Sequence, residues 1–343
     1  MVVVAFWLEH SDIHSMKRKL IPKSLLIVRT DRIGDVILTL PVAQAAKKHL
    51  PEIKIGFLCR NYTKPIVEMS PAVDEVLTIE EENINSKMSV WDAAILVHPT
   101  LSDAWRLYRA RILIRIGTAY RFYSFLFNRK IFEHRKYSVN HELTYNLHLL
   151  RPLGISVEWL EPELIVPDDA LSEAHKILSR ADVEPEEFVA IHPGSGGSAL
   201  NWSPENFRSL AEILKKDGIK YVVTAGPGEL ELAQFVAGGK TNVIFNRPIQ
   251  IVAGIYKLSR AFIGPSTGML HLADAVGTPA FGIYPVLRVT SATRWGPAHN
   301  KAGWISPDLP LCERCRKSCR YYPCTNLISP LEVYRRIVDV LAG

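Results

Sequence analysis

The first half of the chain alternates short apolar runs with amphipathic stretches. Residues 24–29 form an apolar run followed by a polar loop, a pattern that predicts a buried strand. Residues 35–50 then carry apolar side chains at helical spacing, which predicts an amphipathic helix. Further apolar runs predict strands at 53–58, 76–79 and 93–97. Strands that alternate with helices indicate βαβ units and a parallel sheet.

The same alternation begins again in the second half. Strands are predicted at 188–192, 221–224, 261–264 and 280–283. Helices are predicted at 204–216, 229–237, 268–276 and 330–341. Two consecutive α/β series predict two Rossmann-like, doubly wound domains. The expected organisation is an N-terminal extension (1–21), a first domain (22–165), a second domain (166–328) and a final helical segment (329–343), with the join marked by Pro162, Pro167, Asp168 and Asp169.

The N-terminal residues do not resemble a secretory signal. The apolar residues 1–8 come first and the bases Lys17, Arg18 and Lys19 follow, the reverse of the secretory order, and Met16 is an alternative start. The longest apolar runs have about eight residues, whereas a membrane-spanning helix needs about 20. With 343 residues, 48% of them hydrophobic and 22% charged, we expect a two-domain globular protein of the cytoplasm.

Positive charge is concentrated in one segment. The chain has 41 Lys and Arg against 35 Asp and Glu, a net charge of +6. Residues 101–140 alone hold nine bases, Arg115 and Arg121 among them, and two acids. Such a segment attracts a phosphate, an acidic glycan, a nucleic acid or an anionic membrane leaflet, or else it is an ordinary solvated helix face.

Three loops follow predicted strands, at the sheet edge where open α/β sheets bind ligands. The first, residues 29–35, has neither the P-loop nor the dinucleotide-binding glycine spacing. It offers Gly34 for close backbone approach and Asp35 at the start of a helix. Asp35 is either a functional carboxylate or a helix cap, and in both cases the helix N-terminus favours its ionised form.

The other two loops are rich in glycine and hydroxyl groups. Residues 192–198 hold three glycines in four positions and lead to Ser203, the expected N-cap of the next helix. Residues 264–271 place hydroxyl groups at a helix N-terminus, with His271 on its first turn. Loops of this kind bind phosphates, although each is also compatible with an ordinary connection and His271 with a packed histidine. A carboxylate loop in one half and two anion-binding loops in the other suggest a cleft between the domains.

Four motifs, in order along the chain, resemble those of glycosyltransferase family 9, the ADP-heptose:lipopolysaccharide heptosyltransferases. They are residues 26–41, 191–197 with 202–207, 225–229, and 265–279. The resemblance implies the GT-B fold, in which two Rossmann-like domains face a cleft and the final helix returns to the first domain. It also implies inverting, metal-independent transfer of a heptose from ADP-heptose to the inner core of lipopolysaccharide.

The resemblance, the loops and the charged segment together suggest roles for the candidate residues. Asp35 occupies the position of the family's general base. The donor is expected at Gly194, Ser195, Gly196, Gly197, Glu229, Ser266, Thr267, Gly268 and His271. The acceptor is expected at Arg32, Gly34, His98, Arg115, Arg121 and His141. Leu200 stands where the family often has lysine and Ser266 where many members have aspartate; Arg247 and Arg288 are candidate replacements for the lysine.

The chain has five cysteines. Cys59 follows a predicted strand and is expected to be a buried thiol. The others, Cys312, Cys315, Cys319 and Cys324, have the spacing of metal ligands. In a cytosolic chain a structural zinc ion is more natural than disulfides, and free thiols are the other main interpretation, with an iron–sulfur cluster more remote. No cofactor is expected for catalysis.

The leading hypothesis is therefore an enzyme, peripheral on the inner membrane. Its expected partners are a sugar nucleotide, the lipopolysaccharide acceptor and the inner leaflet of the cytoplasmic membrane, and no nucleic acid is expected. One alternative is a non-catalytic nucleotide-sugar-binding paralogue, suggested by Leu200 and Ser266 and opposed by the presence of Asp35. Another is a GT-B enzyme that uses a different sugar nucleotide, either a transferase or an epimerase.

Overall fold

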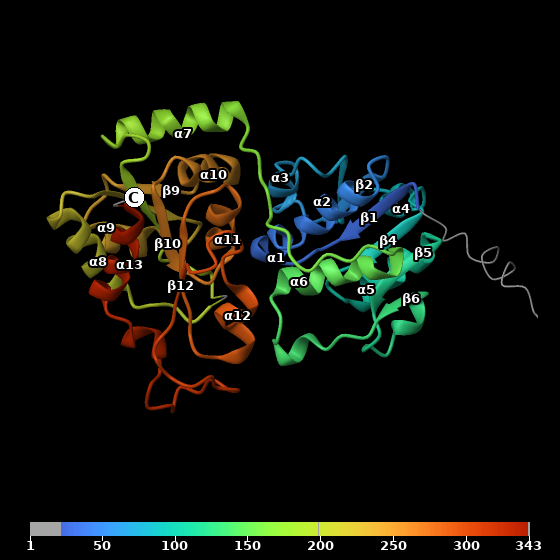
Figure 1. Cartoon of the computed structure of the whole chain (residues 1–343). Coiled ribbons are helices and arrows are strands. Elements are labelled where there is room, and N and C mark those ends of the chain that lie inside the picture. Colours follow the sequence, from blue (N-terminus) through green and yellow to red (C-terminus); the bar gives the residue numbers. More distant parts are fainter. Residues whose placement is uncertain (1–21, 198, 342–343) are drawn as a thin grey trace, which may run out of the picture.

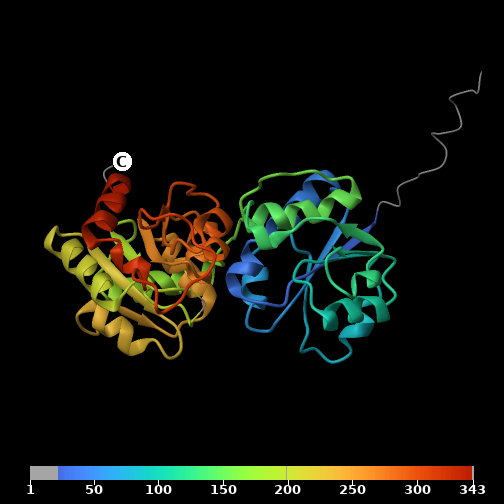
Figure 2. The same ribbon diagram turned by 90° about the horizontal axis from the view of Figure 1, so that it is seen from below.

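The computed structural model describes residues 22–197 and 199–341 (Figure 1). The expected extension over 1–21 lies outside the described residues. Two α/β halves stand side by side, each built on its own six-stranded parallel sheet, and Figure 2 shows them from below as two lobes. The predicted pair of doubly wound α/β units is therefore confirmed. Within the described ranges no helix has the length and apolar character needed to span a membrane.

The first sheet has the strand order β3-β2-β1-β4-β5-β6, and all neighbouring strands are parallel. Its strands are β1 (Ser24–Val28), β2 (Lys54–Cys59), β3 (Glu75–Thr78), β4 (Ala93–Leu96), β5 (Ile114–Thr118) and β6 (Arg129–Ile131). The order changes direction between β1 and β4, the kind of switch point at which open α/β sheets bind ligands. The loop over 29–35 leaves the sheet at this point.

The helices of the first half are α1 (Ile33–Ile37), α2 (Leu40–His49), α3 (Lys64–Val67), α4 (Ile84–Met88), α5 (Leu101–Arg109) and α6 (Glu142–Leu147). The single helix predicted over 35–50 is in fact two helices, α1 and α2. Pro41 lacks the N–H group that would continue the hydrogen bonds of α1. The Thr39 hydroxyl instead donates to the carbonyl of Asp35 at 2.8 Å. The break leaves α1 as a five-residue helix with Asp35 in its first turn.

The second sheet has the order β12-β11-β10-β7-β8-β9, again all parallel. Its strands are β7 (Phe188–Ile191), β8 (Lys220–Ala225), β9 (Val243–Phe245), β10 (Ala261–Pro265), β11 (Ala280–Ile283) and β12 (Trp304–Ile305). Its helices are α7 (Asp168–Arg180), α8 (Pro204–Lys216), α9 (Leu230–Ala237), α10 (Ile249–Lys257), α11 (Gly268–Ala275), α12 (Ala292–Trp295) and α13 (Pro330–Leu341). The glycine-rich loops follow β7 and β10, so they share one edge of this sheet.

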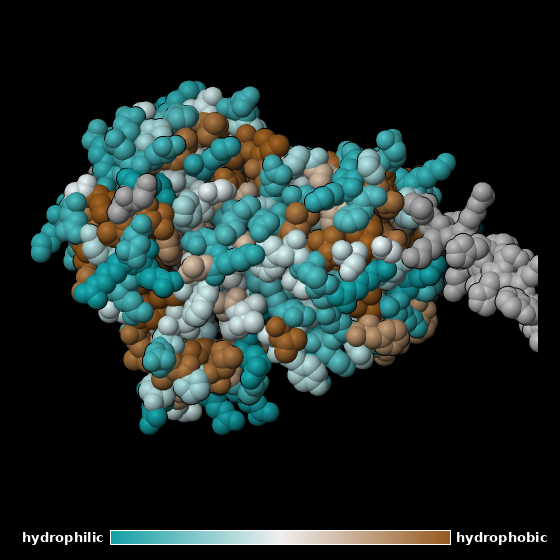
Figure 3. Space-filling model, in the orientation of Figure 1, coloured by the Kyte–Doolittle hydropathy of each residue, from teal (hydrophilic) through white to brown (hydrophobic). Residues whose placement is uncertain are grey.

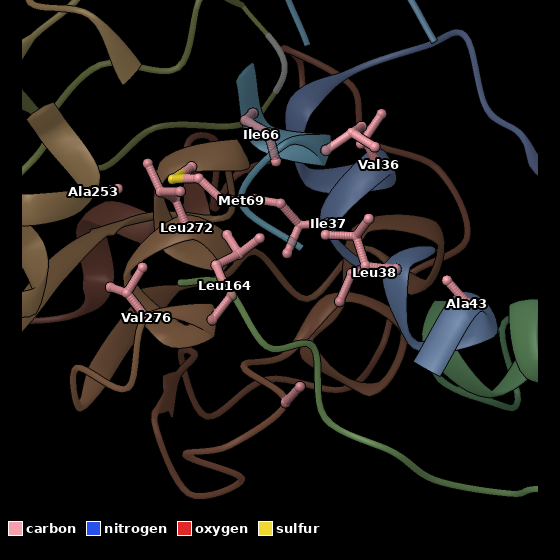
Figure 4. Close-up of a cluster of buried hydrophobic side chains, with 14 of the residues drawn as sticks. Val36, Ile37, Leu38, Ala43, Ile66, Met69, Leu164, Ala253, Leu272 and Val276 are labelled. Carbon is pink, nitrogen blue, oxygen red and sulfur yellow. The ribbon is translucent and has the colours of Figure 1, made fainter. Parts of the chain in front are cut away.

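Apolar side chains from both halves form a continuous core at their boundary. Leu164, in the segment that links the halves, lies among Ile37 and Met69 of the first half and Leu272 of the second (Figure 4). The backbone of this segment forms hydrogen bonds with both halves. The N–H of Leu164 donates to a carbonyl of α11 at 3.2 Å, and the N–H of Ile165 donates to the carbonyl of Met69 at 2.8 Å. The linking segment therefore fixes the position of one half against the other.

Helices α1 and α11 meet across the boundary through two glycines. A Cβ atom on Gly34 would lie 2.8 Å from Cδ2 of His271, and one on Gly268 would lie 2.7 Å from Cγ2 of Ile33. Both distances are too short for real side-chain contacts, so the close approach requires glycine at both positions. It brings the loop after β1 against the N-terminus of α11.

The final helix α13 packs against the second half, which corrects the expectation that it returns to the first domain. Its side chains Val333 and Ile337 are buried against α8 and β10, in a cluster with Trp202 and Phe207. Arg336 adds a hydrogen bond to the carbonyl of Ala302 at 2.6 Å. The apolar stripe of α13 is therefore already covered within its own half.

Candidate active site between the two halves

A buried arginine binds three carboxylates behind the β1–α1 loop. Arg29 follows β1, and its side chain is 3% exposed. Its Nε donates to Asp31 at 2.6 Å, its Nη1 donates to Glu142 at 3.3 Å, and its Nη2 donates to Asp35. A planar guanidinium group with five donors is suited to such a cluster. Asp35 is thereby held in one orientation, while 17% of its side chain stays exposed.

Asp35 does not cap helix α1. The N-cap residue is Arg32, and no side chain accepts a hydrogen bond there. Burial raises the pKa of Asp35, Arg29 lowers it, and the charges of Asp31 and Glu142 raise it, so that the pKa lies above its ordinary value. A helix N-terminus shifts a carboxyl pKa downward, but α1 is short and burial dominates. A carboxylate with a raised pKa is a stronger proton acceptor.

Glu142, the first residue of α6, forms ion pairs on both sides of the boundary. Arg135 donates to its Oε1 at 2.6 Å, and Arg294 of α12 donates to its Oε2 at 3.0 Å. Burial raises the pKa of Glu142, but Arg135, Arg29 and Arg294 together lower it to about 2. Glu142 is therefore ionised at neutral pH. Sequence reasoning identified neither Glu142 nor its three arginine partners as site residues.

The two predicted acceptor histidines have different surroundings. His98 follows β4, and its Nδ1 lies 2.8 Å from Oδ2 of Asp31, with 45% of the side chain exposed. His141 is buried, which lowers its pKa and keeps the ring neutral. Its Nδ1 accepts from the N–H of Leu143, so its Nε2 carries the proton and donates to the carbonyl of Gly296 at 2.9 Å. His98 is open to a ligand, whereas His141 joins the two halves.

A cavity of about 390 Å³ lies at the carboxyl ends of β7 and β8, within the size range of small-molecule sites. Predicted donor residues line it, namely Ser195, Gly196, Glu229, Thr267 and Gly268. Arg32 and Tyr62 of the first half and Arg247 of the second complete its wall. Arg247 therefore lies beside the predicted donor residues. Arg288 does not line this cavity and forms an ion pair with Glu313 at 2.6 Å.

Glu229 organises the glycine-rich loop of this cavity. Its Oε1 accepts from the N–H of Gly196 at 3.3 Å, and its Oε2 accepts from the N–H of Gly226 at 3.0 Å. A Cβ atom on Gly194 would lie 2.1 Å from Oε1 of Glu229, so a side chain at this position would displace the carboxylate that holds the loop. Gly197 is exposed and is not among the residues that line the cavity.

A second cavity, of about 240 Å³, extends from the first toward Asp35. The two cavities share Arg32, Thr267 and Gly268 as lining residues. The smaller one also contains predicted residues from both halves, namely Gly34, Asp35, Ser266 and His271. The carboxylate and both hydroxyl-bearing residues of the β10–α11 loop therefore face one space.

Two buried polar atoms at the N-terminus of α11 have no hydrogen-bond partner among the described residues. They are Oγ1 of Thr267 and Nδ1 of His271. Burial, with a smaller effect of His141, lowers the pKa of His271 to about 3, so its ring is neutral at pH 7. Buried polar groups usually have partners, and helix N-termini bind anions. The arrangement suits an anionic ligand that would pair with these atoms.

A third cavity, of about 400 Å³, lies beyond β4, β5 and β6 in the first half. Its basic lining residues are Arg121, Arg135 and Lys136. Arg121, one of the expected acceptor residues, thus lines this cavity. Arg115 is not among the lining residues, because its guanidinium group donates to the carbonyls of Leu126 at 2.8 Å and Ile112 at 2.5 Å.

The cysteines do not form a recognisable metal site. Over residues 22–197 and 199–341, no three histidine, cysteine or acidic side chains are arranged to hold a metal ion. All five cysteines are free thiols, with Cys315 and Cys319 exposed. The prediction of a structural zinc ion is thus not supported. Cys59 is buried as predicted, and burial raises the pKa of its thiol to about 12.

Comparison with known proteins places the chain in a family. The sequence model of glycosyltransferase family 9 (heptosyltransferase) matches residues 87–324. A Haemophilus influenzae protein provisionally named a glycosyltransferase is 26% identical over 336 aligned residues, which cover 92% of this chain and 97% of that protein. Lipopolysaccharide heptosyltransferase 3 of Escherichia coli is 25% identical over 296 residues, covering 78% of this chain and 84% of that protein.

The fold agrees with this placement. The structure of E. coli ADP-heptose lps heptosyltransferase II matches with a TM-score of 0.76 and 17% identity, over 93% of this chain and 98% of that chain. The two halves thus have the GT-B arrangement that the sequence resemblance implies. Since the family model covers well over half of the residues, the chain belongs to glycosyltransferase family 9, the heptosyltransferase family, and is a glycosyltransferase.

Proposed function

We propose that this enzyme transfers a heptose from ADP-heptose to the inner core of lipopolysaccharide, with inversion and without a metal ion. The observation that carries the proposal is the position of Asp35 in a cavity that continues the 390 Å³ cavity at the carboxyl ends of β7 and β8. The substrates are supported by the names of two relatives, a lipopolysaccharide heptosyltransferase and an ADP-heptose lps heptosyltransferase.

The nucleotide occupies the larger cavity and the sugar the smaller one. The diphosphate lies where the two cavities meet, against Thr267 and Gly268 at the N-terminus of α11. Arg32 lines both cavities and Arg247 lines the larger one, so two guanidinium groups are available to the diphosphate. These cations, the helix N-terminus and the loop amides stabilise the charge that develops on the leaving ADP.

Asp35 acts as the general base. An acceptor hydroxyl attacks the anomeric carbon from the face opposite the diphosphate. A new carbon–oxygen bond forms, the bond from that carbon to the phosphate oxygen breaks, and ADP leaves with the bonding electrons. The proton of the attacking hydroxyl passes to Asp35, whose raised pKa favours its acceptance. Attack from the opposite face inverts the anomeric configuration, as in single-displacement glycosyl transfer.

The acceptor binds in the first half. The third cavity offers Arg121 and Lys136 to the anionic groups of an inner-core glycan. Arg135 lines the same cavity and bonds Glu142, which in turn bonds Arg29 beside Asp35. A chain of ion-paired side chains therefore leads from this cavity to Asp35. Because such an acceptor is attached to lipid, we place the enzyme peripherally on the cytoplasmic face of the inner membrane.

A panel of sugar nucleotides tests the proposal. A ligand at 100 times its Kd should stabilise the protein by about 2.7 kcal/mol in thermal unfolding. We expect this from ADP and ADP-heptose but not from UDP or GDP sugars. With ADP-heptose and an inner-core acceptor, ADP should be released and the product should gain one heptose by mass spectrometry.

The same panel separates the alternatives. Stabilisation by UDP or GDP sugars alone would contradict the donor assignment and support another GT-B reaction. Stabilisation by ADP-heptose with no ADP release from any inner-core acceptor would contradict the transfer reaction and support a non-catalytic binding protein.

A further inference from the structure

The first half carries an unusually exposed group of aromatic side chains around α5, η1 (Ser124–Leu126) and β6. The residues Phe122, Phe125 and Phe132 are 82%, 72% and 75% exposed. The other members are about half exposed, namely Trp105, Tyr108, Tyr120 and Tyr137. In Figure 3 apolar surface lies among hydrophilic atoms at the lower right, over the region of α5, β5 and β6 in Figure 1. Exposed apolar patches of this kind mark interaction sites.

Several of these rings, and the elements that carry them, are in contact with one another. Tyr120 packs edge-on against Phe132 with ring centroids 6.3 Å apart, and it stacks on His134 at 3.6 Å. Trp105 and Tyr108 stack on the outer side of α5 at 5.6 Å. Helix α5 and strand β5 both contact η1, which stands next to Phe122 and holds Phe125. We call these seven aromatic residues and the bases between them the aromatic–basic surface.

Six exposed bases of this surface form no ion pair within the described residues. They are Arg109, Arg111, Arg121, Arg129, Lys130 and Lys136. The acids of the segment do not offset them, because Asp103 is paired with Arg106 at 3.1 Å and Glu133 contacts His148 at 2.9 Å. The surface therefore combines uncompensated positive charge with protruding phenylalanine rings.

We propose that the aromatic–basic surface docks on an anionic lipid bilayer. The phenylalanine rings enter the boundary between headgroups and acyl chains, and the bases contact lipid phosphates. The three most exposed rings are phenylalanines, which have no polar group for pairing with a glycan or a base edge. A surface of phenylalanine and unpaired arginine or lysine is complementary to an apolar layer beneath negative charge.

This orientation also places the acceptor cavity at the membrane. Tyr120, Arg121 and Lys136 belong both to the surface and to the lining of the 400 Å³ cavity. A glycan attached to a lipid of the docked bilayer would enter the cavity without leaving the membrane. This last step rests on the proposed function, whereas the docking itself does not.

Vesicle flotation with the full chain tests the proposal. The probes are vesicles of phosphatidylcholine alone and vesicles that also contain phosphatidylglycerol, an anionic lipid. We expect binding to the anionic vesicles only. The triple variant Arg109→Gln, Arg129→Gln, Lys130→Gln should bind about 10²-fold more weakly, roughly fivefold per base. The triple variant Phe122→Ser, Phe125→Ser, Phe132→Ser should bind the anionic vesicles at least about tenfold more weakly than the parent.

Matched controls come from the second half. The charge control is the triple variant Lys215→Gln, Lys216→Gln, Lys257→Gln. These lysines are exposed, so the variant removes three positive charges at a distance from the aromatic–basic surface. Phe235, Leu327 and Leu331 are 42%, 55% and 46% exposed, and their change to Ser removes apolar groups elsewhere. Both controls should bind vesicles like the parent, and all variants should keep the thermal shift with ADP.

Three results would overturn the docking proposal. They are failure of the parent to float with anionic vesicles, unchanged binding in both surface variants, and equal losses in surface variants and controls. None of these results depends on transfer activity, so each leaves the proposed reaction standing. Conversely, absence of heptose transfer would leave vesicle binding untouched.

Discussion

Arg294 of the second half donates to Glu142 of the first through Nε at 3.2 Å and Nη2 at 3.0 Å. Glu142 also binds Arg29, and Arg29 binds Asp35. Asp35 and the second half are therefore connected through Arg29 and one buried carboxylate. The contact between Arg294 and Glu142 is one of the ion pairs that join the two halves.

Changing Glu142 to Gln should shift the acid limb of the pH profile of kcat/KM to lower pH. The charge of Glu142 raises the pKa of Asp35, so its removal lowers that pKa and the base forms at lower pH. The variant also breaks a buried ion pair, which costs about 3–5 kcal/mol of stability, so the pH profile must be measured well below its melting temperature.

Changing Arg29 to Gln should move the same limb in the opposite direction. Arg29 lowers the pKa of Asp35, and without it Asp35 keeps its proton to higher pH. Side-by-side pH profiles of the parent and both variants provide the comparison. If the acid limbs of both variants shifted in the same direction, the charges of Glu142 and Arg29 would not control the pKa of Asp35.

Changing Thr267 to Val should weaken donor binding without destabilising the protein. Oγ1 of Thr267 is buried without a partner, so its removal costs no hydrogen bond within the described chain. A lost hydrogen bond to a charged diphosphate corresponds to about 1.5–3 kcal/mol, or roughly 10- to 150-fold in the Kd for ADP-heptose. Calorimetry measures that Kd.

The matched control is Thr325, whose buried hydroxyl donates to the carbonyl of Asn201 at 2.8 Å. Thr325→Val should lower stability by about 0.5–1.5 kcal/mol and leave the Kd unchanged. If Thr267→Val bound ADP-heptose with the parent's affinity, the Thr267 hydroxyl would not contribute to donor binding.

Changing Gly196 to Asp should abolish stabilisation by ADP. Gly196 has a φ of +52° with open space at its Cβ position, a conformation that aspartate tolerates better than most residues. The main effect is then a negative charge on the wall of the donor cavity. Gly218 has a φ of +74° and equal space but lies in the α8–β8 turn, so Gly218→Asp is the control for backbone effects. Equal loss of the ADP thermal shift in both variants would contradict the electrostatic explanation.

Local patterns predicted the parts of the site that lie within one loop. The apolar run before residue 29 and the glycines near 194–197 identify strands and the loops at their carboxyl ends. The register of a parallel sheet then brings such loops to one edge. Asp35 and Thr267 were found in this way because each is close in sequence to a strand end.

Long-range partners were missed because no local pattern specifies them. Arg29 and Glu142 are 113 positions apart, and Glu142 and Arg294 are 152 apart. The sequence also did not show that Arg115 would bond its own neighbouring carbonyls, or that the stripe of α13 would be covered by α8. Such pairings depend on how the packed elements meet.

The measurement that most directly tests the account is kcat for Asp35→Asn with ADP-heptose and an inner-core acceptor. Asparagine keeps the size of the side chain and an oxygen that can accept from Arg29, but it cannot take the proton. We predict a loss of kcat of about 10²–10⁴-fold, with the Kd for ADP-heptose close to the parent's. Asp31→Asn, which removes another carboxylate bound to Arg29, should keep most of the parent's kcat. A folded Asp35→Asn enzyme with the parent's kcat would contradict the assignment of Asp35 as the general base.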